Sequence, residues 1–185
     1  SLEGVALAPD VTVSQAEIGL DTLTFMKMVL TEFAGALEEV VGPEETAGYV
    51  NGVASNVADW LNATYHNALG PELFTVERIA HVLADLRTRI DGTYTVRSVS
   101  ADKIVLANAP GLFGAGAEGT HALCQMSATV FGRFAAENTG YARIEHAPAT
   151  DNAASSCNVT IHFRQSDDLR PGEREYFRVD ELHFG

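Results

Sequence analysis

The sequence predicts an α+β domain in which helices come first and an antiparallel sheet with one inserted helix follows. Three observations lead to this prediction. Apolar residues recur at helical spacing through residues 14–91, short β-type runs fill much of residues 92–185, and one further helical stretch lies between those runs. No internal repeat or linker divides the 185 residues, so we expect a single domain over residues 1–185.

The N-terminal half is expected to hold three helices, over residues 14–41, 43–69 and 76–90. Ser14 is a suitable N-cap for the first and Thr75 for the third, while Gly and Pro residues separate the three. The apolar stripes that define them are Ile18, Met26, Val29, Leu30, Phe33, Leu37 and Val40; Val50, Val53, Val57, Trp60, Leu61 and Tyr65; and Ile79, Val82, Leu83, Leu86 and Ile90.

The C-terminal half changes to strand-like patterns. Two short runs at 93–100 and 103–108, separated by Ala101-Asp102, predict a hairpin. A fourth helix is expected over residues 120–138. The remaining expected strands cover residues 140–146, 157–163 and part of 175–184.

Composition limits the function classes. The net charge is −13, of which −10 falls in residues 1–91, the helical half. Because such a surface repels phosphate backbones, we expect no nucleic-acid partner. No stretch approaches the ~20 apolar residues of a membrane span, and no signal peptide pattern is visible. We therefore expect a cytoplasmic protein without a membrane partner.

The glycine-rich stretch Gly114-x-Gly116-x-x-Gly119 has the spacing of a dinucleotide-binding loop. However, residues 109–113 separate it from the preceding strand, and no parallel strand pattern follows. A flexible turn that allows positive φ fits better. A glycine-rich segment before a helix also leaves backbone N–H groups free, so an anionic or polar ligand remains an alternative.

Two thiols and one imidazole form the second candidate site. Strand alternation places Cys157 and His146 on apolar faces, and Cys124 opens the fourth helix, so all three are expected to point between helix and sheet. This set suits zinc or iron if one more ligand is added. The alternative is that both cysteines and the histidine are packing residues, since the chain has no Cys-x-x-Cys pair.

Three segments together carry a family resemblance: FTVERIAHVLADLRTRIDGTYTVRSVSADKIVLANAPGLFG, LCQMSATVFGRFAAENTGYARIEHAP and CNVTIHF. They resemble the methanogen output domain family of prokaryotic signalling proteins, which is itself similar to vinyl-reductase-type (4VR) small-molecule-binding domains. The resemblance implies a ligand-responsive regulatory domain without catalysis. It also implies metal-binding cysteines near Cys124, His146 and Cys157. One expected thiol is absent between Asn108 and Gly114, and His146 stands where relatives often have cysteine.

We therefore expect a cytoplasmic sensory domain that binds a small ligand between the fourth helix and the sheet, with a signalling protein as a further partner. The expected ligand-binding residues are Phe113, Gly114, Gly116, Gly119, His121 and Cys124. The apolar stripes of the first two helices exceed what one small sheet can cover, which predicts a helix-mediated homodimer. The alternatives are a thiol-based metal or redox protein, and an enzyme that uses the glycine turn.

Overall fold

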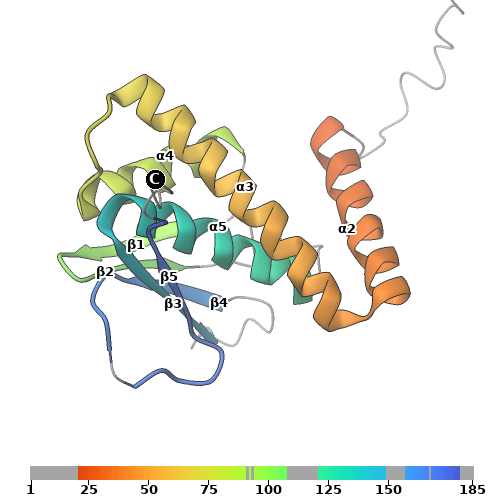
Figure 1. Ribbon diagram of the computed structural model, residues 1–185. Coiled ribbons are helices and arrows are strands. Elements are labelled where there is room, and N and C mark those ends of the chain that lie inside the picture. Colours follow the sequence, from red (N-terminus) through yellow and green to blue (C-terminus); the bar gives the residue numbers. More distant parts are fainter. Residues whose placement is uncertain are drawn as a thin grey trace, which may run out of the picture.

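The computed structural model describes residues 21–90, 92, 94–107, 121–148, 157–166 and 168–179, and for residues 121–124, 147–148 and 157 it describes the backbone alone. Within these ranges the chain forms four helices and a five-stranded sheet (Figure 1). The helices are α2 (Thr22–Val41), α3 (Pro43–Leu69), α4 (Val76–Arg89) and α5 (His121–Thr139). The strands are β1 (Thr95–Ser100), β2 (Lys103–Ala107), β3 (Tyr141–Pro148), β4 (Cys157–His162) and β5 (Arg174–Phe177). The predicted α+β class is confirmed.

The first described helix begins later than the sequence pattern suggests. Asp21 has an extended backbone with φ −126°, and its Oδ1 accepts a hydrogen bond of 2.6 Å from the backbone N–H of Thr24. This side-chain cap starts α2 at Thr22. The predicted start at Ser14 is therefore wrong for the helix that carries Phe33, and Ser14 itself lies outside the described residues.

The predicted breaks between helices are confirmed. Gly42, at φ +86°, ends α2 and donates its N–H to the carbonyl of Glu38 at 2.9 Å, and α3 starts at the next residue. Thr75 caps α4 by accepting from the N–H of Arg78 at 3.2 Å.

None of the helices within the described ranges combines the length and apolarity that crossing a membrane requires.

The sheet has the strand order β1-β2-β4-β3-β5, and every neighbouring pair is antiparallel. The predicted hairpin is β1–β2, with a register shift between Val96 and Ser98. β4 lies between β2 and β3, so the strands on either side of α5 in the chain do not pair with each other. The register aligns Ile104, Ile161 and Ile144 in one row across the three central strands.

One face of the sheet carries the core. α4 packs on β1 and β2, and α5 packs on β3, β4 and β5, so both helices cover the same side (Figure 1). The alternate strand positions on that side are fully buried: Ile104, Leu106, Ala142, Ile144, Val159 and Ile161. α3 packs across the outside of α5. α5 lies between α3 and the sheet. From Ser127 to Ala136, residues on almost every side of this helix are therefore buried.

Candidate functional site

The predicted ligand-binding residues are mostly beyond what the structure describes. Phe113, Gly114, Gly116 and Gly119 lie outside the described residues. His121 and Cys124 belong to the first turn of α5, where the backbone alone is described. Ligand binding by these six residues therefore stays a prediction.

The strand register partly supports the proximity of His146 and Cys157. His146 of β3 pairs with Val159 of β4, and Pro148 pairs with Cys157, so only two positions along β4 separate Cys157 from the partner of His146. The side chain of His146 is exposed. Among the residues whose side chains are described, no three His, Cys, Asp or Glu groups gather to hold a metal. Both cysteines are outside that set, so the zinc or iron site stays a prediction.

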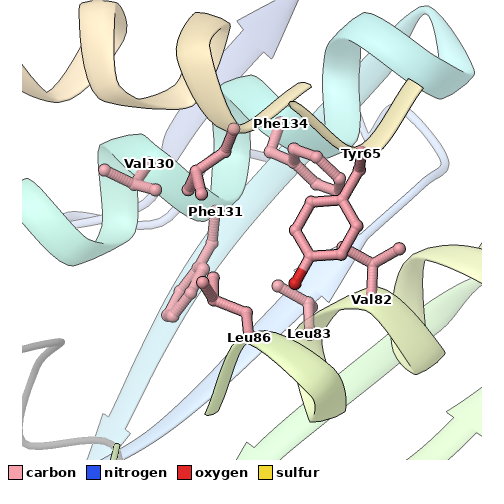
Figure 2. A pocket seen from close by; sticks show the side chains of 8 residues that line it. Tyr65, Val82, Leu83, Leu86, Val130, Phe131 and Phe134 are labelled. Atoms are coloured by element: carbon pink, nitrogen blue, oxygen red, sulfur yellow. The ribbon is translucent and has the colours of Figure 1, made fainter. Parts of the chain in front are cut away.

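The helical core is closely packed where the structure describes it. Figure 2 shows side chains of α3, α4 and α5 pointing toward one another, with the ring of Tyr65 among them. Tyr65 meets Phe134 edge-on at 6.4 Å between ring centroids, and its hydroxyl donates to Asp85 Oδ2 at 2.7 Å. The gaps between these side chains are too narrow to hold a water molecule.

The described part of the contact between α5 and the sheet is made by buried apolar side chains. Phe131 and Ala135 of α5 and Ile144 and Ile161 of the sheet are each no more than 1% exposed. The expected ligand site lies toward the start of α5, at residues 113–124, whose side chains are outside the described part of the chain, so it stays a prediction.

A cavity of about 340 Å³ lies elsewhere, in a groove between α2 and α3. We call it the α2–α3 groove. Its lining residues are all apolar or aromatic and come from three helices: Leu30, Phe33, Ala34 and Leu37 of α2, Tyr49, Val50 and Val53 of α3, and Met126 of α5. The α2 members are spaced three and four residues apart, as one face of a helix requires.

The walls of the α2–α3 groove are unusually open to water for apolar side chains. Phe33 is 68% exposed, Tyr49 59% and Val53 53%, while Ala34 and Val50 at the bottom are buried. Ala34 is also the only described residue of α2 that is buried. Large contiguous apolar patches are typical of ligand-binding grooves and protein interaction surfaces, which makes the α2–α3 groove the candidate site.

A polar cluster fixes α5, and with it Met126, against α3 and the sheet. Thr129, one turn after Met126, donates its hydroxyl hydrogen to Asn51 Oδ1 at 3.0 Å, and Arg174 Nη1 donates to the same oxygen at 3.4 Å. The hydroxyl of Tyr176 lies 3.2 Å from Thr129 Oγ1. Burial raises the pKa of Tyr176. The floor of the groove is therefore held by α3, α5 and β5 together.

Five of the eight lining residues belong to the apolar stripes expected from the sequence: Leu30, Phe33, Leu37, Val50 and Val53. The spacing of Leu30, Phe33 and Leu37 predicts an interaction face, and Val53 belongs to the apolar stripe expected for α3. Tyr49 and Met126 are not expected there. Tyr49 precedes the predicted buried stripe by one residue, and Met126 comes from a helix 76 positions after Val50 in the chain, so only the tertiary structure brings it to the groove.

Comparison with known proteins adds one match. The family described as Methanogen output domain 1 matches residues 29–162, which run from α2 to the end of β4 and include every residue lining the groove. The resemblance seen in the sequence is confirmed and extends further toward the N-terminus than the segments that suggested it. No curated protein matches the chain.

Proposed function

We propose that the chain, which belongs to the methanogen output domain 1 family, is a cytoplasmic, non-catalytic regulatory domain that binds a small apolar molecule in the α2–α3 groove. The family name indicates an output role in signalling. Which molecule controls that output is the part we propose here.

The observation that carries this proposal is the cavity of about 340 Å³ with its apolar lining. Small-molecule sites have volumes of roughly 300–1,000 Å³ and mostly apolar walls. A pocket at the lower end of that range suits a compact aromatic or aliphatic molecule. Since none of the eight lining side chains is charged at neutral pH, a neutral ligand fits better than an anion.

Binding there gives a route to regulation. α2 is attached to the rest of the domain through few contacts, and one of its residues is buried. A ligand that touches α2, α3 and Met126 at once would favour one placement of α2 over others, and an effector changes an equilibrium only through such differential contacts. In a homodimer formed through α2 and α3, a change in the placement of α2 would be transmitted to the other copy.

A fluorescence titration with N-phenyl-1-naphthylamine, a neutral apolar probe, tests the proposal. We expect saturable binding that falls at least tenfold in Val53→Glu, which places a carboxylate in the α2–α3 groove. Val179→Glu is the matched control, because Val179 is 61% exposed and lies outside the groove. Equal binding by both variants, or no saturable binding by the wild type, would rule the proposal out.

The thiol-based alternative is supported by the register that brings His146 and Cys157 near each other. As a second candidate function, the domain would bind zinc or iron through Cys124, His146 and Cys157 and respond to metal or redox state. Elemental analysis after anaerobic purification without chelator decides it. A stoichiometric metal that is lost in Cys124→Ser and in Cys157→Ser supports this function, and metal-free protein eliminates it.

A further inference from the structure

We propose that a second copy of this chain covers the α2–α3 groove, with the two α2 helices packed antiparallel about a two-fold axis near Phe33. This inference rests on the proposed function, because it names the partner that closes the same site.

α2 exposes more apolar surface than a helix of a monomeric domain normally does. Eight large apolar side chains of this 20-residue helix are exposed: Leu23, Phe25, Met26, Met28, Val29, Leu30, Phe33 and Val40. Tyr49, Val53 and Trp60 of α3 add to them. A helix that is apolar over most of its surface is normally buried in a larger assembly.

The apolar surface of α2 is self-complementary. Met26, Val29, Phe33, Leu37 and Val40 follow one another at spacings of three and four, and Phe33 is the midpoint of that stripe. In an antiparallel pair, Met26 therefore faces Val40 of the other copy, and Phe33 faces its own equivalent. An isologous dimer needs this kind of symmetry.

The charges at the end of α2 favour the antiparallel arrangement over the parallel one. Glu38, Glu39, Glu44 and Glu45 gather where α2 turns into α3. A parallel pair would bring eight carboxylates together at one end of the dimer. With the two-fold axis near Phe33, an antiparallel pair separates the two turns at Gly42 by about 27 Å, or 18 residues of helix. Beyond a Debye length of about 8–10 Å, such charges are largely screened.

The available surface is adequate for a stable dimer. Phe33, Tyr49 and Trp60 are 68%, 59% and 65% exposed. At roughly 150–250 Å² for an aromatic side chain, these three alone offer on the order of 400 Å². The aliphatic residues of the same two helices raise this toward the ~800 Å² per partner of a standard interface.

The dimer also gives the proposed ligand an enclosed site. The second α2 would lie over the open side of the α2–α3 groove, so a bound molecule would contact both copies. Binding and dimerisation then strengthen each other by the same factor, as linkage requires. We therefore expect N-phenyl-1-naphthylamine to shift the monomer–dimer equilibrium toward the dimer.

Cross-linking tests the geometry. In the double variant Met26→Cys/Val40→Cys, a short bismaleimide should give a covalent dimer whose linked peptides join position 26 of one copy to position 40 of the other. The single variant Met26→Cys should give no product that joins position 26 of both copies, since antiparallel packing separates those positions by about 21 Å, or 14 residues of helix. Mass spectrometry of the linked peptides distinguishes the introduced thiols from the native Cys124 and Cys157. A product that joins position 26 of both copies would overturn the antiparallel arrangement.

Light scattering after size exclusion tests the dimer itself. We expect the wild type and the control Leu169→Asp to be dimeric. The Val40→Asp dimer should dissociate at protein concentrations at least tenfold above those at which the wild-type dimer dissociates. Val40 and Leu169 are both exposed, at 82% and 51%, and neither lines the α2–α3 groove. A monomeric wild type, or a Val40→Asp protein that dissociates like the control, would overturn the inference.

The same proteins separate this inference from the proposed function. Monomeric Val40→Asp keeps its groove and should still bind N-phenyl-1-naphthylamine, but with reduced affinity. A dimeric wild type that binds no probe refutes the ligand proposal and leaves the dimer standing. A monomeric wild type that binds the probe refutes the dimer and leaves the ligand proposal standing.

Discussion

The ring of Tyr176 lies directly against the backbone of Gly132, so that a Cβ at position 132 would overlap the ring atoms. Tyr176 belongs to β5, an edge strand of four residues, and Gly132 lies in the middle of α5. The close approach lets the Tyr176 hydroxyl reach Thr129 and so join the cluster that holds α5 against α3.

Gly132→Ala should therefore destabilise the domain by about 1–3 kcal/mol, because the added methyl group forces the ring or the strand to move. Gly52→Ala is the matched control: Gly52 lies in α3, and a Cβ there meets nothing within 4 Å. That control should gain about 0.4–1 kcal/mol from reduced unfolded-state entropy. Urea unfolding measures both values, and a neutral Gly132→Ala would contradict the close packing.

Asn138 connects three segments at the other end of α5. Its Oδ1 accepts from the N–H of Phe74 and from His66 Nε2, both at 3.0 Å, and its Nδ2 donates to Asn62 Oδ1 at 2.9 Å and to the Phe134 carbonyl at 3.0 Å. The residue is 3% exposed. Its amide therefore ties the α3–α4 connection to α5.

Asn138→Ala should cost about 2–3 kcal/mol of unfolding free energy, because the N–H of Phe74 loses its partner in a buried place. Asn56→Ala removes an exposed asparagine from α3 and should change stability by less than about 0.5 kcal/mol. Urea unfolding of the two variants gives the comparison. Equal effects would show that the hydrogen bonds of Asn138 add little.

Arg143 and Glu173 form an ion pair of 2.6 Å on the sheet face away from the helices, with side chains 11% and 4% exposed. Arg143→Met should cost about 1.5–3 kcal/mol, as for hydrogen bonds to charged groups. Arg164→Met is the control, since its pair with Asp102 is 77% and 49% exposed and is worth less than about 1 kcal/mol. Similar losses in the two variants would contradict the difference in burial.

Acid should reduce the contribution of that ion pair. Burial raises the pKa of Glu173, but the backbone N–H of Arg170 and the charge of Arg143 outweigh it and hold the pKa below its usual value. A carboxyl with a lowered folded-state pKa adds stability above its unfolded pKa and loses it as the pH falls through the folded value. Wild type and Arg143→Met should thus converge in stability in acid, which urea unfolding across pH can show.

Alkaline pH should destabilise the domain through its tyrosines. Burial and the hydrogen bond to Asp85 raise the pKa of Tyr65 to about 12, and burial with the Glu175 contact raises that of Tyr141 to about 12. A tyrosine whose pKa is raised in the folded state stabilises the domain fully below pH 10, which is the pKa of tyrosine in the unfolded chain. This stabilisation is lost as the pH rises toward 12.

The change should appear in two measurements. Tyrosinate absorbance should include a component that titrates well above pH 10, and the unfolding free energy should fall between pH 10 and 12. In Tyr65→Phe the unfolding free energy should fall less steeply over this pH range, because one titrating hydroxyl has been removed. A wild type whose tyrosinate absorbance is complete near pH 10 would contradict the prediction.

Local signals explain which elements the sequence could predict. Gly42-Pro43 and Gly70 set the bounds of α3, Thr75 caps α4, and Ala101-Asp102 turns the β1–β2 hairpin, each within a few residues. The insertion of β4 between β2 and β3 depends on long-range pairing, which no local pattern contains. The start predicted for α2 is wrong because the apolar spacing continues through the cap at Asp21.

The candidate site is less accessible to sequence reasoning. The exposed stripe of α2 is visible as an excess of apolar residues, and it suggests self-association. The cavity itself depends on how α2, α3 and α5 cross, so neither its position nor the role of Met126 follows from spacing. The ligand site expected between α5 and the sheet involves residues 113–124, whose side chains lie outside the described part of the chain, so that expectation stays a prediction.

The chain's three methionines provide the most direct measurement of the central claim, because Met126 lines the α2–α3 groove while Met28 is 60% exposed outside it. The methyl NMR signals of methionine-labelled protein can be followed during titration with N-phenyl-1-naphthylamine. A ligand in the α2–α3 groove predicts a saturable shift of the Met126 signal and little change at Met28. A Met126 signal that stays in place while the probe is bound, or equal shifts at Met28 and Met126, would contradict it.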